Sequence, residues 1–137
     1  MPIGRWVLRE ACLQTRRWNG RCPGDPPLTA CVNLSARQFQ GPGLARDVAR
    51  ILQEPGLNPR HLSLEVTESV LMEDAHSTIA TLRGLKGLGV ELAVNDFGTG
   101  YSSLSHLRRS PIDHLKIDRS FVEEFKGNAE APRSCRG

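Results

Sequence analysis

Four short strand-like runs recur along this chain at a nearly constant interval, and this recurrence limits the possible folds more than any other feature. The runs cover 28–33, 62–67, 90–96 and 114–118. A helical pattern precedes each run, at 2–18, 44–52, 74–88 and, as a short helix, 102–109. Strands that alternate with helices predict an α/β fold with a parallel sheet.

The spacing of polar residues indicates which α/β fold this is. Asn33, Glu65 and Asn95 each stand near the end of a run, about 30 residues apart, and Lys116 follows in the fourth run. A (β/α)8 barrel spreads about 250 residues over eight units, or roughly 31 residues per unit. The sequence therefore predicts part of a (β/α)8 TIM-type barrel, with about four parallel strands alternating with helices.

Alternation within each run predicts which side chains face the covering helices and which face the barrel interior. The apolar set is expected beneath the helices: Leu28, Ala30, Val32, Leu62, Leu64, Val66, Leu92, Val94, Leu115 and Ile117. The other set is expected to face inward: Thr29, Cys31, Asn33, Ser63, Glu65, Thr67, Glu91, Ala93, Asn95, His114, Lys116 and Asp118. Barrel interiors are ordinarily filled with branched apolar residues, so a polar interior indicates function.

Asn33, Glu65, Asn95, Asp96 and Lys116 are the candidate site residues. The possible ligands among them are all oxygen donors, which suit Mg²⁺ or Mn²⁺. Adjacent acidic residues at a strand end can serve two metals, and a lysine beside them can orient a metal-bound water. The alternative is structural: Glu65 and Lys116 form a buried ion pair, and the asparagines bond backbone groups. Spacing alone leaves both possibilities open.

Composition excludes several classes of function. The net charge of +3 includes no long basic run, which argues against a nucleic-acid partner. No apolar run is long enough for a membrane segment and no signal peptide opens the sequence, so we expect a cytoplasmic location. The four cysteines lack metal-ligand spacing, and Cys31 is expected to be a small buried residue.

Three blocks of sequence, VNLSARQF, LEVTESVLMED and NDFGTGYSSLSHLRRSPIDHLKIDRSF, resemble the EAL domain, the cyclic-di-GMP-specific phosphodiesterase family of bacterial signalling. The resemblance covers 1–122 and implies strands three to six of a modified (β/α)8 barrel. It also implies hydrolysis of cyclic-di-GMP to pGpG with two Mg²⁺ or Mn²⁺ ions. The tail, 123–137, diverges from the family, and we expect it to be disordered.

The resemblance assigns roles to individual residues. Asn33, Glu65 and Asp96 match metal ligands, Lys116 matches the lysine beside the attacking water, and Glu68 matches the glutamate that anchors the loop after the aspartate pair. That loop matches a segment that couples substrate binding to dimer contacts: Phe97, Gly98, Thr99, Gly100, Tyr101, Ser102 and Ser103.

The sequence departs from the family in three places. The Glu-Ala-Leu tripeptide is absent from it, as are the Glu-Gly-Val-Glu glutamate and a further glutamine that belong to strands seven and eight of the family. Asn95 stands where the family has an aspartate that bridges both metals, and a neutral amide cannot bridge in the same way. We therefore expect impaired catalysis by this chain alone. The alternatives are an enzyme completed by a partner chain, a non-catalytic module that pairs with itself or with EAL or GGDEF proteins, and the remnant of a broken reading frame.

Overall fold

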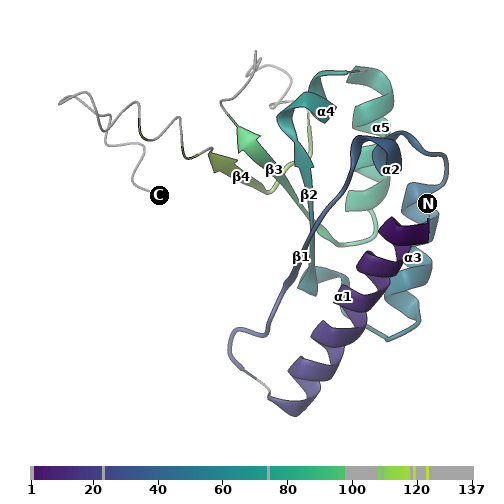
Figure 1. The fold of residues 1–137 in the computed structure, drawn as a ribbon, viewed down its shortest axis with the longest axis vertical. Helices are drawn as coiled ribbons and strands as arrows, with labels where there is room; N and C mark the ends of the chain where they lie inside the picture. Colours follow the sequence, from purple (N-terminus) through teal and green to yellow (C-terminus); the bar gives the residue numbers. More distant parts are fainter. Residues whose placement is uncertain are drawn as a thin grey trace.

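The chain forms a four-stranded, all-parallel sheet in the computed structural model, which describes residues 2–22, 24–73, 75–97, 108, 110–117, 119 and 123 (Figure 1). The strands are β1 (Ala30–Asn33), β2 (Leu62–Thr67), β3 (Glu91–Phe97) and β4 (His114–Ile117). They lie side by side in chain order, β1-β2-β3-β4. The predicted α/β class and parallel sheet are confirmed.

Three longer helices separate the first three strands or precede them. They are α1 (Pro2–Arg21), α3 (Leu44–Gln53) and α5 (Ala75–Lys86), all close to their predicted positions. The sequence patterns explain two of them. Leu44, Val48, Ile51 and Leu52 form a buried stripe along α3. Past the end of α5, Gly89 adopts a left-handed φ of 94°, a conformation that suits glycine at a helix end.

Three short elements were not predicted: α2 (Ala36–Gln40), the 3-10 helix η1 (Pro59–His61) and α4 (Glu68–Met72). The signal for α2 is a capping box, in which Ser35 Oγ accepts a hydrogen bond from the Gln38 N–H and the Gln38 side chain accepts one from the Ser35 N–H. A five-residue helix shows too few turns for apolar periodicity to reveal it.

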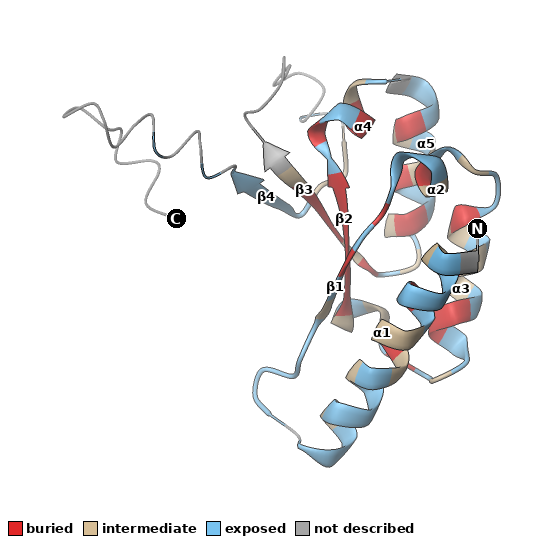
Figure 2. Ribbon diagram, viewed as in Figure 1, coloured by how far each residue is buried: buried red, intermediate tan, exposed pale blue. Residues whose placement is uncertain are grey.

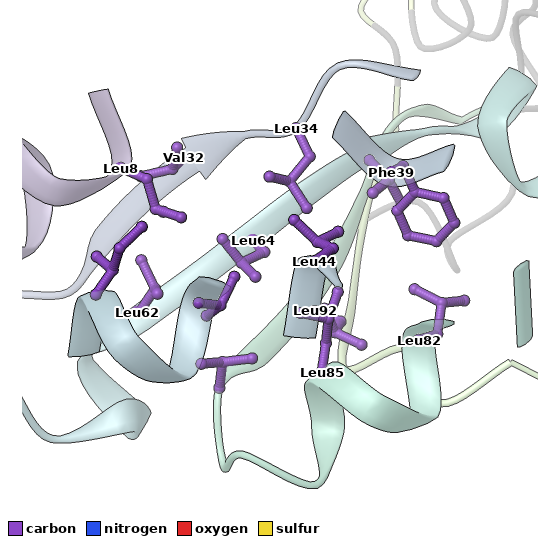
Figure 3. Close-up of a cluster of buried hydrophobic side chains, with 14 of the residues drawn as sticks. Leu8, Val32, Leu34, Phe39, Leu44, Leu62, Leu64, Leu82, Leu85 and Leu92 are labelled. Atoms are coloured by element: carbon purple, nitrogen blue, oxygen red, sulfur yellow. The ribbon is translucent and has the colours of Figure 1, made fainter. Parts of the chain in front are cut away.

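The hydrophobic core lies between the sheet and the longer helices (Figures 2 and 3). Val32, Leu64 and Leu92 contribute from three neighbouring strands, and Leu8 and Leu85 pack against them from α1 and α5. Leu62, Leu64, Leu85 and Leu92 are fully buried. The predicted helix-covered face is therefore confirmed for Val32 of β1 and for β2 and β3, but it is wrong for Leu28, which precedes β1 and is 50% exposed.

The prediction is wrong for β4, because Leu115 and Ile117 remain 47% and 45% exposed. The described helices pack over the first three strands, and β4 lies at the edge beyond them (Figure 2). Cys31 was also expected to be buried but is exposed, because it lies on edge strand β1 and faces away from the helices.

Further predictions fall outside the described residues: the inward-facing Asp118, the loop over 98–103, the short helix over 102–109, apart from Arg108, and the disordered tail over 123–137, apart from Glu123. Across the described part of the chain, no helix combines the length and the apolar character needed to cross a membrane.

Candidate functional site

The register of the sheet brings the candidate residues of β1, β2 and β3 to the same end. Asn33 pairs with Glu65 across β1 and β2, and Thr67 pairs with Asn95 across β2 and β3. Their neighbours Val32, Leu64 and Val94 point into the helix-covered core. Because side chains alternate along a strand, Asn33, Glu65 and Asn95 occupy the opposite face, at the carboxyl end where barrel enzymes place their sites.

A change of register on β3 coincides with the Asn95–Asp96 doublet. Val94 pairs with Leu115 and Phe97 pairs with Ile117, so two residues of β3 oppose the single residue Lys116 on β4. Such a bulge re-aims side chains and is frequent beside functional sites. The bulge explains how two adjacent polar residues, Asn95 and Asp96, can both stand opposite Lys116. The side chains of Asp96 and Phe97, and all of Gly98–Ser103, lie outside the described residues.

Lys116 and Glu65 are in direct contact. The Lys116 amine donates a hydrogen bond to Glu65 Oε1 and forms an ion pair with it. The hydrogen bond from Lys116 to the Glu65 carboxylate raises the pKa of Lys116, so the amine is charged at neutral pH. The Glu65 side chain is 6% exposed and that of Lys116 49%, so a nearly buried carboxylate is compensated by a cation that remains in contact with solvent.

The sequence left open a structural alternative to a metal site, an ion pair between Glu65 and Lys116, and this ion pair is present. It does not by itself exclude a ligand role for Glu65, because the second carboxylate oxygen has acceptor capacity beyond the bond to Lys116. Glu68, the first residue of α4, is 3% exposed and directly follows Thr67, the last residue of β2. Its predicted role as a loop anchor depends on 98–107, which lie outside the described residues.

The donor set fits a hard divalent cation in kind, since the described candidates are amide and carboxylate oxygens. It supplies little uncompensated charge, because the Glu65 charge is already opposed by Lys116. Within 2–22, 24–73, 75–97 and the described residues beyond, no group of three or more His, Cys, Asp or Glu side chains is arranged to hold a metal ion. The fit therefore depends on Asn33, Glu65 and the Asp96 side chain acting together.

Three polar contacts at the amino ends of β3 and β4, the ends opposite the candidate site, were not foreseen. His114 Nε2 lies 3.2 Å from Glu91 Oε2 on the neighbouring strand. Asp113, just before β4, accepts hydrogen bonds from both Lys86 Nζ and the Leu92 N–H. Burial raises the pKa of Asp113, but the bonds from Lys86 and Leu92 outweigh it and leave the pKa of Asp113 below its ordinary value.

Comparison with known proteins gives a consistent result. The EAL domain family model matches residues 1–137. The bifunctional diguanylate cyclase/cyclic di-GMP phosphodiesterase MucR of Pseudomonas aeruginosa is 46% identical over 130 residues, which are 95% of this chain and 19% of MucR. The protein y4lL of Sinorhizobium fredii is 44% identical over 95% of this chain and 15% of its own length.

Solved structures agree. The Pseudomonas aeruginosa MucR phosphodiesterase in complex with c-di-GMP superposes with a TM-score of 0.85 at 45% identity, and the match covers 95% of this chain and 52% of that one. The EAL domain of Mycobacterium smegmatis DcpA gives a TM-score of 0.83 at 44% identity over 96% of this chain and 58% of that one. The chain thus spans about half the length of these solved domains and less than a quarter of these curated relatives.

Proposed function

Because the chain belongs to the EAL domain family, we propose that it contributes the central strands of a cyclic-di-GMP phosphodiesterase site in which Asn95 weakens hydrolysis. The expected reaction is metal-dependent opening of cyclic-di-GMP to pGpG. The proposal extends to this chain what the MucR complex describes for a relative, and it implies a bacterial signalling role in the cytoplasm.

The observation that carries the proposal is the shared position of Asn33, Glu65 and Asn95. All three lie on the face of the sheet opposite α1, α3 and α5, at the carboxyl ends of adjacent parallel strands. A core without a site would fill this position with apolar side chains, as the helix-covered face does. In this proposal Asn33, Glu65 and Asp96 hold Mg²⁺ or Mn²⁺.

A bound cation would polarise the phosphodiester and lower the pKa of an attacking water. This chain's own residues then have separate tasks. Lys116 fixes the orientation of the Glu65 carboxylate through their hydrogen bond and keeps a positive charge beside the place where phosphate oxygens bind. Glu68 anchors the Phe97–Ser103 loop, which carries substrate and dimer contacts, with a second copy or another EAL or GGDEF protein as the partner.

Asn95 sets the level of activity. It occupies the first position of the doublet that opposes Lys116, where the family has a bridging aspartate. An amide offers one carbonyl oxygen and no charge, so it binds a second cation far more weakly than a carboxylate. Each tenfold loss of rate corresponds to only about 1.4 kcal/mol of barrier, so the loss of one bridging ligand is enough to reduce turnover strongly.

The test combines calorimetry with a product assay. The full chain is titrated with cyclic-di-GMP in the presence of Mn²⁺, and pGpG is quantified by chromatography. The proposal expects Mn²⁺-dependent binding with little or no pGpG, and loss of binding in Glu65→Ala. Rapid turnover that Glu65→Ala abolishes would contradict the predicted impairment, and binding that survives Glu65→Ala without Mn²⁺ would contradict the proposed site.

A further inference from the structure

The attachment of β4 decides whether Lys116 reaches Glu65. β4 has four residues, all exposed, and it pairs with β3 alone among the described strands. The bulge opposite Lys116 interrupts even that pairing. A strand held this weakly can slip, and a slip of one residue would turn Lys116 from the inner face to the outer face.

Asp113 attaches the start of β4 to β3 through both its backbone and its side chain. Its backbone N–H donates to the Leu92 carbonyl at 2.9 Å, and its side-chain Oδ2 accepts from the Leu92 N–H at 2.8 Å. Leu92 is fully buried within β3, so its position in the sheet is held by the surrounding core. These two bonds to one residue define the register at which β4 begins.

Lys86 completes the attachment. It is the last residue of α5, and its Nζ donates to Asp113 Oδ2 at 2.6 Å and to the Val90 carbonyl at 3.1 Å. The end of α5, the residue before β3 and the residue before β4 therefore meet at one cation. We call Lys86 and Asp113 with their bonds to Val90 and Leu92 the strand clasp.

We propose that Asp113 is a positioning residue, which acts through the strand clasp to set the register of β4 and so deliver Lys116 to Glu65. The clasp lies at the amino end of β4 and the Lys116–Glu65 contact at its carboxyl end, so the two contacts hold opposite ends of one short strand. The importance of Lys116 rests on the proposed function, but its placement by Asp113 does not.

The titratable groups that face each end of β4 are different. Asp113 is faced by Lys86 and His114, whereas Lys116 is faced by Glu65 and Cys31. The bonds of Lys86 and Asp113 go to Val90, Leu92 and one another and not to Glu65, so the clasp acts on the Lys116–Glu65 contact through the strands that it attaches.

The experiment measures the placement of Lys116 without substrate or metal. In nuclear magnetic resonance at fixed neutral pH, the Lys116 side-chain ammonium should give a distinct, slowly exchanging signal while it is bonded to Glu65, and Glu65→Gln identifies that signal by removing it. Lys86→Met and Asp113→Ala should both shift the signal to the position of a free lysine. Lys86→Arg, which keeps a cation at the clasp, should largely restore it.

Amide exchange distinguishes positioning from general destabilisation. In Lys86→Met, the described amides of β4 should exchange about tenfold faster or more, while those of β2 keep their protection. The matched control is Arg5→Gln, which removes an ion pair between α1 and α3 and should leave the Lys116 signal and β4 exchange unchanged. An unshifted Lys116 signal in both clasp variants, or equal acceleration in β2 and β4, would overturn the proposal.

Discussion

Lys116 on β4 donates a hydrogen bond to Oε1 of Glu65 on β2, and it does so across β3, which lies between them. Two strands that are not neighbours are thereby joined on the face of the sheet opposite α1, α3 and α5. The bond links the stability of edge strand β4 to a carboxylate near the middle of the sheet, and it places a charged pair at the centre of the candidate site.

Removal of the lysine charge should destabilise the protein. Lys116→Met leaves the buried Glu65 carboxylate without its cation, and we expect the free energy of unfolding to fall by about 1–3 kcal/mol, less than for a fully buried pair because Lys116 is half exposed. Urea denaturation at neutral pH measures this loss. Arg119→Gln is the control, because it breaks an exposed pair with Glu123 and should cost less than about 0.5 kcal/mol. Equal losses in both variants would contradict the assignment.

Two leucines on the same face of the sheet should respond differently to truncation, because Leu92 lies on a central strand and Leu115 on edge strand β4. Leu92 is fully buried, so Leu92→Ala should lower the free energy of unfolding by about 2–5 kcal/mol. Leu115 is 47% exposed at the edge, so Leu115→Ala should cost less than about 1 kcal/mol. Thermal denaturation of both variants provides the comparison, and a larger loss at Leu115 would show that β4 is covered by part of the chain outside the described residues.

Much of this fold could be predicted from local sequence patterns. β2 has the predicted bounds of 62–67, and the apolar stripe of α3 is buried as its spacing indicates. These elements were predictable because their periodicity spans several residues and reports burial directly. The face assignment failed at Leu115 and Ile117, because alternation predicts a face of the sheet but not whether a helix covers it.

The site was predictable in part. Regular spacing identified Asn33, Glu65 and Asn95, and the register brings their strand ends together. The bulge at Asn95–Asp96 was not predictable, since simple alternation allows only one residue opposite Lys116. The strand clasp was also missed, because Asp113 lies 21 residues from Leu92 and 27 from Lys86, and no local pattern reports such contacts.

The cysteines should differ sharply in reactivity. Burial raises the pKa of Cys12 to about 11, whereas Cys22 and Cys31 are exposed. A thiol whose pKa is raised in the folded state contributes stability below its unfolded pKa of about 9, and that contribution is lost as the pH rises toward 11. Alkylation at pH 8, followed by peptide mass spectrometry, should label Cys22 and Cys31 quickly and Cys12 only on unfolding. Rapid labelling of Cys12 in folded protein would contradict this prediction.

Acid should weaken the strand clasp. The pKa of Asp113 lies below the ordinary value of 3.8, so its contribution to stability is present above that pH and is lost as the pH falls through the lower folded value. The free energy of unfolding, measured by denaturant titration from pH 5 down to pH 2, should therefore fall less steeply in Asp113→Asn than in the wild type. Identical slopes would show that Asp113 titrates alike in the folded and unfolded chains.

The central claim is that oxygen side chains at the carboxyl ends of these strands form a divalent-cation site that Asn95 weakens. The most direct measurement is Mn²⁺ binding, followed by electron paramagnetic resonance, in the wild type, Asn95→Asp and Glu65→Ala. A carboxylate at position 95 should tighten binding by about tenfold or more, and Glu65→Ala should abolish the site. Equal Mn²⁺ affinity in the wild type and both variants would contradict the account.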